Sequence, residues 1–215
     1  MRAPHSTPGR RPLSPPRALA VALAVALAAP AIAVQMSDVA PIAAMGALAT
    51  VQDEAEGALP SAERAVKAAY LYKFLGYVDF PGGPLDPGAP YVVGVAGAED
   101  VAGELTRQTS GRMVNNHAVV VRRLHDGDSA AGLHLLFIGA AEGGAEAALV
   151  KAAQAAGALS VTESATGIEA GSIINFLLVD ERVRFEVSLA AAERGRLKLS
   201  SRLLSVAYAV LKGGG

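Results

Sequence analysis

The stretch "NFLLVDERVRFEVSLAAAERGRLKLSSRLLSVA", residues 175–207, carries the most definite structural pattern in the chain. Within it, apolar and polar residues alternate strictly over RVRFEVSL, residues 182–189. A period of two residues predicts a strand with one buried face and one face in solvent. The preceding apolar run, INFLLV, is joined to this strand through Asp180-Glu181. We therefore expect the two runs to form an antiparallel hairpin.

A helix is expected after the hairpin. Ser200 or Ser201 is suited to cap its amino end, because a serine hydroxyl can accept a hydrogen bond from a free backbone N–H of the first turn. Apolar residues beyond the cap would share one helical face. They are Leu203, Leu204, Ala207, Val210 and Leu211. The pattern predicts a packed C-terminal helix that nearly reaches the end of the chain.

Upstream of the hairpin, short apolar runs alternate with helix-like segments. Strands are expected at 91–97, 118–124, 133–139 and 158–162, and helices at 98–108, at 141–157 and between Ser61 and Pro81. Such alternation predicts a mostly parallel sheet that is covered on both faces. The expected fold class is therefore α/β. It would be a three-layer α/β/α sandwich with a mostly parallel sheet, a C-terminal antiparallel hairpin and a packed C-terminal helix.

The N-terminus has the pattern of an export signal. Residues 1–33 hold four arginines and no acid, and the apolar run at 18–29 is followed by Ala31-Ile32-Ala33, which suits a signal peptidase. The run is shorter than the roughly 20 residues of a bilayer span. Cleavage near Ala49, a twin-arginine route through Arg10-Arg11 and an uncleaved anchor stay open as alternatives. We expect a signal peptide over 1–33, a flexible connector over 34–60 and a single domain over 61–212.

Composition narrows the class of protein. The chain has 215 residues, 52% of them apolar, which is enough for one domain with a real core. Outside residues 1–33, 15 basic residues face 20 acids, a balance that argues against a general nucleic-acid binder. The chain has no cysteine, so it has neither disulfides nor thiol chemistry. An exported domain of this kind is typical of the bacterial periplasm.

Candidate catalytic and cofactor motifs are weak. GVAGAEDVAGEL places a helix after a strand, but it departs from GxGxxG, and Glu99 and Asp100 in the first turn would repel a phosphate. The run His125-Asp126-Gly127-Asp128 is typical of a plain turn and lacks a second histidine at metal-binding spacing. His134 lies in a predicted strand, which favours a hydrogen-bonded structural role. We expect no enzyme, no cofactor and no bound metal.

Two segments resemble a known family. AVKAAYLYKFLGYVDFP (65–81) and the stretch quoted first are similar to the YfiR-like family of bacterial periplasmic proteins. That family combines an alanine-rich helix carrying Leu-Tyr-x-Phe with a strand of the "INFxLxxGRVRFEI" kind and a following "AxxxGLKISSKLLxLA". The resemblance spans nearly the whole predicted domain. The chain departs from the family pattern in having Phe80 where tryptophan is common, and from the best-known member in having no cysteines.

The resemblance implies a non-enzymatic regulator. The best-known family member represses a membrane-bound diguanylate cyclase from the periplasmic side, and so lowers cyclic-di-GMP and biofilm formation. The implied partner is the periplasmic domain of an inner-membrane sensor, a diguanylate cyclase or a histidine kinase, and a homodimer also stays open. The alternative is a module that binds a small ligand or a cell-wall fragment in a cleft at the ends of the parallel strands.

Positive charge is concentrated in the C-terminal part of the chain. Residues 182–202 hold six basic residues and two acids. We interpret this segment as a contact surface for an acidic partner, with charge steering the approach and Leu197 or Leu199 providing a desolvated anchor. A plain solvated face is the alternative. The expected contact residues are Arg182, Arg184, Glu186, Glu193, Arg194, Leu197 and Lys198.

Overall fold

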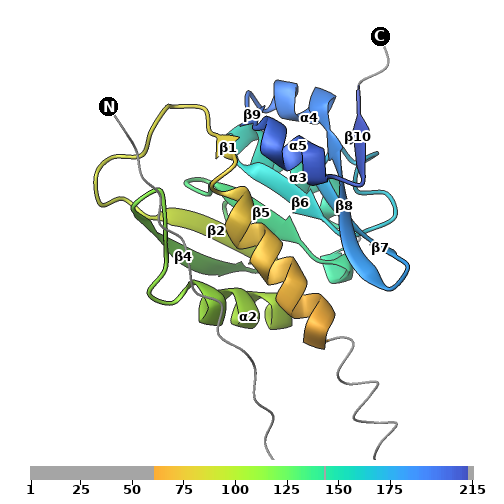
Figure 1. The fold of residues 1–215 in the computed structure, drawn as a ribbon, viewed down its shortest axis with the longest axis horizontal. Helices are drawn as coiled ribbons and strands as arrows, with labels where there is room; N and C mark the ends of the chain where they lie inside the picture. The colour runs from red at the N-terminus through yellow and green to blue at the C-terminus, as the bar shows by residue number, and fades with distance from the viewer. Residues whose placement is uncertain (1–60, 143, 213–215) are drawn as a thin grey trace, which may run out of the picture. The chain divides into compact units, whose positions relative to one another are not determined.

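The structure, a computed structural model, describes residues 61–142 and 144–212. Its main sheet is built from β2 (Tyr91–Ala96), β3 (Met113–Val114), β4 (His117–Leu124), β5 (Leu135–Ile138), β6 (Leu159–Thr162), β7 (Ile174–Val179), β8 (Arg182–Ser188) and β10 (Ala209–Leu211). The strand order is β10-β8-β7-β6-β5-β2-β4-β3 (Figure 1). Within this part of the chain, β8 pairs with β7 and β3 with β4 in antiparallel fashion, and the other five pairs are parallel. The expected mostly parallel sheet is confirmed.

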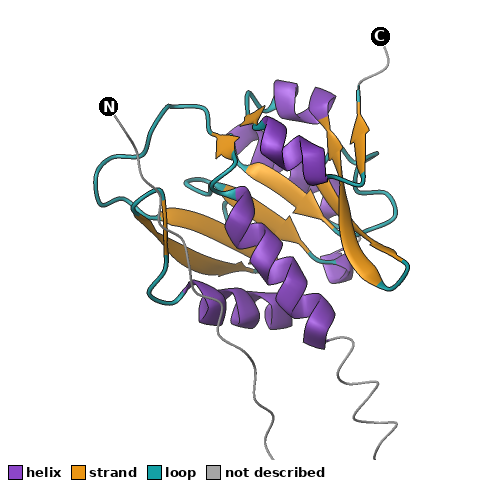
Figure 2. Cartoon of the chain, viewed as in Figure 1, coloured by secondary structure: helices purple, strands orange, loops and turns teal. Residues whose placement is uncertain are grey.

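The described helices flank this sheet (Figure 2). The chain is helical over residues 61–74. Later helices are α2 (Glu99–Thr109), the short 3-10 helix η1 (Ala140–Glu142), α3 (Glu146–Ala156), α4 (Leu189–Arg194) and α5 (Ser201–Val206). Helix α3 ends at Gly157, whose φ of 70° lets its N–H reach back to the last turn, and this confirms the predicted stop.

The central strands are buried on both faces, which explains their unbroken apolar runs. All four residues of β5 are fully buried, and neighbouring residues point to opposite faces. Leu135 and Phe137 join the cluster that includes α2 and the helix over 61–74, whereas Leu136 and Ile138 pack with α3. The three-layer α/β/α arrangement predicted from the sequence is therefore confirmed.

Aromatic rings of the helix over 61–74 pack against those of the C-terminal hairpin. The ring centroids of Phe74 and Phe185 are 5.1 Å apart, and those of Tyr70 and Phe185 are 5.3 Å apart, both in edge-to-face geometry. Phe176 on β7 contacts the same two helix residues and also Phe137 on β5. Edge-to-face and offset pairs of this kind add to the free energy of simple apolar burial. The first and last thirds of the described chain thus share one core.

The C-terminal hairpin matches its prediction. Strands β7 and β8 pair antiparallel with Val179 opposite Arg182. The two residues between them, Asp180 and Glu181, have φ of 48° and 58°. Positive φ at both positions is what a two-residue type I′ turn requires, and this turn follows the natural twist of the strands.

The predicted C-terminal helix is only partly right. Ser200 caps it as expected, because its Oγ accepts a hydrogen bond from the N–H of Leu203. The helix stops at Val206, however, and the chain continues as β10, which pairs parallel with β8. Val210 and Leu211 therefore belong to a strand. Their apolar side chains suit either structure, and the free edge of β8 supplies backbone partners that a longer helix would leave unused.

Four further elements have no counterpart in the sequence predictions, namely α4, β1, β3 and β9. Helix α4 begins at Leu189, which was expected to end a strand, because Ser188 accepts a hydrogen bond from the N–H of Ala191 and caps the helix. Strands β1 (Val78–Asp79) and β9 (Lys198–Leu199) form a separate two-stranded antiparallel sheet. These strands are too short to carry a pattern of their own.

The expected signal peptide over 1–33 and connector over 34–60 lie outside the described residues. The single domain over 61–212 stays a prediction. Among the helices that the structure describes, none combines the length and the apolar character needed to cross a bilayer.

Candidate functional site

The expected contact residues on β8 occupy its outer face. Arg182 and Arg184 are exposed, and the side chain of Val183 between them points into the core. Glu186 is different, because it accepts a hydrogen bond of 3.1 Å from the amide of Asn175 on β7. Asn175 in turn accepts one of 2.9 Å from the hydroxyl of Thr162. Glu186 therefore belongs to a polar network within the sheet, while the two arginines are free to meet a partner.

The other expected contact residues are spread over two more elements. Glu193 and Arg194 are exposed on α4, and Lys198 is exposed on β9. Within residues 61–142 and 144–212, none of the basic residues Arg182, Arg184, Arg194 and Lys198 forms an ion pair. Their charge is thus not neutralised by neighbours in this part of the chain.

Leu197 does not fit the anchor role expected of it. Its side chain is only 4% exposed and belongs to the main core cluster. The preceding residue, Arg196, has a φ of 58°, and this turn brings the Leu197 N–H to the carbonyl of Ala192 at 2.9 Å. Leu199, the other candidate anchor, is half-buried against the same cluster. The turn after α4 therefore directs the side chain of Leu197 into the core.

The structure has an apolar groove that the sequence predictions did not include. It lies between the helix over 61–74 and α5, has a volume of about 430 Å³ and has Phe185 in its lining. Tyr77 and Val206 line it with partly exposed apolar surface, and Lys73 and Arg202 add positive charge. The groove was missed because Val206 was expected in the middle of a longer packed helix. Phe185 and Arg184 point to opposite faces of β8, so the groove and the outer arginines are separate surfaces.

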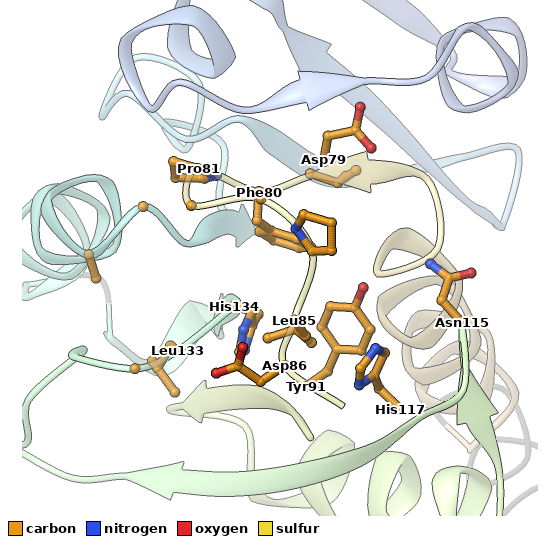
Figure 3. Close-up of a pocket in the computed structure, with 17 residues that line it drawn as sticks. Asp79, Phe80, Pro81, Leu85, Asp86, Tyr91, Asn115, His117, Leu133 and His134 are labelled. Carbon is orange, nitrogen blue, oxygen red and sulfur yellow. The ribbon is translucent and has the colours of Figure 1, made fainter. Parts of the chain in front are cut away.

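A larger pocket lies at the amino ends of β2, β4 and β5. It has a volume of about 790 Å³ (Figure 3). The loop after β1 forms one wall, and the start of β4 forms another. Its principal side chains are Asp79, Phe80, Tyr91, Asn115, His117 and His134. Ligand sites of open α/β sheets usually lie at the carboxyl ends of the strands, so this pocket is on the less usual edge.

Backbone contacts fix the proton positions on both histidines of this pocket. The Nδ1 atom of His134 accepts a hydrogen bond of 3.0 Å from the N–H of Val92, so the neutral ring carries its proton on Nε2. The Nδ1 atom of His117 is 2.7 Å from the carbonyl oxygen of Ala89, which can only accept, so that nitrogen is the donor. Burial and the nearby His117 lower the pKa of His134, which favours its neutral form.

The expected structural role of His134 is confirmed by its hydrogen bond, but no sequence pattern indicated that it borders a pocket. The pocket residues come from separate segments, and Phe80, Tyr91 and His134 meet only in the fold. The aromatic before Pro81 was the one local signal, since an aromatic ring at that place needs a surface to pack on.

The two motifs set aside in the sequence have ordinary roles in the structure. Glu99 pairs with Arg123 at 2.7 Å, and Asp100 pairs with Arg64 at 3.2 Å, so the first turn of α2 is negative and already partnered. In the turn at 125–128, the carboxylate of Asp128 accepts a hydrogen bond from the His125 N–H. The described ranges contain no group of three or more His, Asp or Glu side chains placed to hold a metal ion.

Comparison with known proteins places the chain in a family. The profile of the YfiR/HmsC-like family matches residues 64–208, which is most of the chain. This protein therefore belongs to the YfiR/HmsC-like family, a family of periplasmic regulatory proteins rather than enzymes. No curated protein matches the chain.

One solved structure similar to this chain is a conserved domain protein from Vibrio cholerae O1 biovar El Tor str. N16961. The two sequences are 11% identical, and the TM-score is 0.44. The match covers 56% of this chain and 54% of the solved chain. This likeness is too slight to carry a conclusion about fold or function.

Proposed function

We propose that this protein is a regulator that binds the periplasmic domain of a membrane-bound signalling protein and represses it. A diguanylate cyclase is the first candidate partner, and a histidine kinase is the second. Membership of a family of periplasmic regulators supports the general role. The observation that carries the proposal is the set of exposed basic side chains on β8, α4 and β9, which have no ion pairs in the described structure.

These basic residues suit an acidic partner surface for a physical reason. The chain outside residues 1–33 has more acids than bases, so a local group of cations stands out against it. Opposite charges on two proteins raise the rate of encounter, and this effect falls as salt screens it. Hairpin β7–β8 is held by the aromatic core beneath it, so Arg182 and Arg184 are presented on a rigid support.

Charge reversal on this surface tests the proposal. The double variant R184E/R194E should slow association with the periplasmic domain of the partner sensor, which is to be sought first among the products of the neighbouring genes. The salt dependence of the rate should weaken, and signalling in cells should be derepressed. Because both side chains are exposed and unpaired, the free energy of unfolding should change by less than about 0.5 kcal/mol.

Two variants serve as controls for this experiment. The first control is R112E, which is compared with the single variant R184E. Arg112 is exposed beside β3, at the opposite edge of the sheet, so its charge reversal should leave the association rate unchanged. K73E/R202E changes the basic residues of the apolar groove and asks whether the partner uses that surface instead. Full repression and an unchanged association rate for R184E/R194E would show that the outer basic residues are only a solvated face.

A further inference from the structure

We propose that the pocket at the amino ends of β2, β4 and β5 binds a small organic cation, an ammonium compound of the size of a small metabolite. The pocket volume of about 790 Å³ lies within the range of small-molecule sites. This site is separate from the basic residues to which the proposed partner binding is assigned. The inference therefore does not depend on the identity of the partner.

The charges around the pocket favour a cation. Asp79 and Asp86, both exposed, are the acidic residues of its lining, and among the described residues no lysine or arginine lines it. Asp86 lies beside His134, whereas the carboxylate of Asp79 points away from the rings (Figure 3). Lys198 lies opposite Asp79 in the β1–β9 pair, but the two form no ion pair in the described chain. A carboxylate or phosphate ligand would meet the like charge of Asp86, whereas an ammonium group would meet an opposite charge.

Aromatic rings provide the apolar part of the site. Tyr91 lies at its centre, with its ring centroid 5.9 Å from that of Phe80 and 5.2 Å from that of His134. His117 contacts the same tyrosine edge-to-face at 5.7 Å. The faces of tyrosine and phenylalanine attract ammonium groups through their negative π-clouds, and sites for quaternary ammonium compounds are commonly built from such rings.

Two polar side chains of the pocket, Tyr91 and Asn115, make no hydrogen bond to any described residue. Tyr91 is only 7% exposed, yet its hydroxyl makes no hydrogen bond to any described residue and points into the pocket (Figure 3). This hydroxyl is not itself a buried atom, because among the described side chains Glu146 Oε2 is the buried polar atom that lacks a partner, so the Tyr91 hydroxyl is open to water or to a ligand. The side chain of Asn115 borders the same space and is likewise unbonded within the described chain.

The two histidines add a fixed donor and a fixed acceptor. Because the Nδ1 of His117 donates to Ala89, its Nε2 in the neutral ring is an acceptor, which suits the N–H or hydroxyl of an amine. His134 has the opposite arrangement, with its Nε2 proton available to an oxygen of the ligand. The pocket thus combines negative charge, aromatic faces and hydrogen-bonding groups that are already oriented.

The carboxyl edge of the sheet is a poorer candidate for this ligand. There Lys67 forms an ion pair of 2.6 Å with Glu163, and it also pairs with Glu63. Glu163 accepts a further hydrogen bond of 3.0 Å from the N–H of Ala140. The polar groups at that edge are partnered with each other, whereas in the pocket at the amino edge the side chains of Asp86, Asn115 and Tyr91 have no partner among the described residues.

The proposal is tested with choline and its neutral isostere, 3,3-dimethyl-1-butanol, added to the purified protein. Calorimetry would measure binding, and NMR would follow the ring signals of Tyr91, His117 and His134. Choline should bind saturably and shift these signals, and the neutral alcohol should bind at least about tenfold more weakly, because it lacks the charge that the carboxylates and rings attract.

Variants assign the effect to the pocket. The double variant D79N/D86N should weaken choline binding by at least about tenfold, and D126N, an acid-to-amide change in a turn outside the pocket, should leave it unchanged. Y91F should keep the aromatic face and bind choline only a few-fold more weakly. Equal binding of choline and the neutral alcohol would overturn the proposal. So would the lack of saturable choline binding up to about 10 mM.

Discussion

The two faces of β8 differ sharply, although their residues alternate along one strand. On the inner face, Phe185 is 1% exposed and packs against Tyr70 and Phe74 of the first described helix. On the outer face, Arg182 and Arg184 are exposed and form no ion pairs in the part of the chain described. The comparison teaches that neighbouring residues can serve stability and recognition separately, so substitutions one position apart should give opposite kinds of defect.

The largest expected effect comes from the inner face. Phe185→Ala should lower the free energy of unfolding by about 3–5 kcal/mol, because it leaves a cavity where three aromatic rings meet. Urea denaturation of the purified protein measures this change. Leu178→Ala is the control, since Leu178 is 58% exposed near the tip of the same hairpin and should lose much less. A loss below about 1 kcal/mol for Phe185→Ala would mean that the inner face is not a central part of the core.

A second expected effect sharpens the comparison at α5, which packs on the same core. Leu203→Ala should cost about 2–5 kcal/mol, because Leu203 is fully buried. Leu204→Ala should cost clearly less, since Leu204 is only partly buried. Thermal unfolding of the two variants, side by side, measures the difference. Equal losses would contradict the difference in burial that the structure assigns to these two leucines.

A smaller loss of stability is expected for a buried polar residue on the outer face of the hairpin. Asn175 lies on that face but is 4% exposed, and its amide links Thr162 to Glu186. Asn175→Ala should cost about 1–3 kcal/mol, because it leaves buried polar atoms without partners. Denaturant unfolding compares it with Leu177→Ala, a partly exposed neighbour on the same strand. If Asn175→Ala unfolds like the parent protein, water satisfies Thr162 and Glu186 at no cost, and the whole outer face is solvated.

Local patterns predicted those parts of the fold in which the signal is local. The alternation in β8, the turn at Asp180-Glu181 and the glycine stop at Gly157 each depend on a few adjacent residues, and each is confirmed. Residues 209–211 were expected to be helical because their apolar spacing suits a helix as well as a strand. Only the free edge of β8, which is distant in the sequence, decides between the two.

In the candidate sites, too, the sequence predicted only those features that depend on neighbouring residues in the chain. The sequence placed Arg182, Arg184, Arg194 and Lys198 correctly on the surface, because charged side chains rarely leave water. It misplaced Leu197, since the inward turn depends on the backbone of the residue before it. The pocket could not be predicted, because its rings and carboxylates come from four separate segments and no single segment contains a ligand-binding motif.

The aromatic contact between the first described helix and the hairpin has a consequence for how the protein acquires its structure. Tyr70 and Phe74 lie on the helix over 61–74, at the start of the described chain, whereas Phe176 lies on β7 and Phe185 on β8. Figure 1 shows this helix beside the β7–β8 hairpin. Closing so long a loop before its contacts can form costs conformational entropy and slows folding. A chain still emerging from the ribosome therefore lacks the partners that bury its first described helix. The core of this protein can assemble only when almost the entire sequence is present.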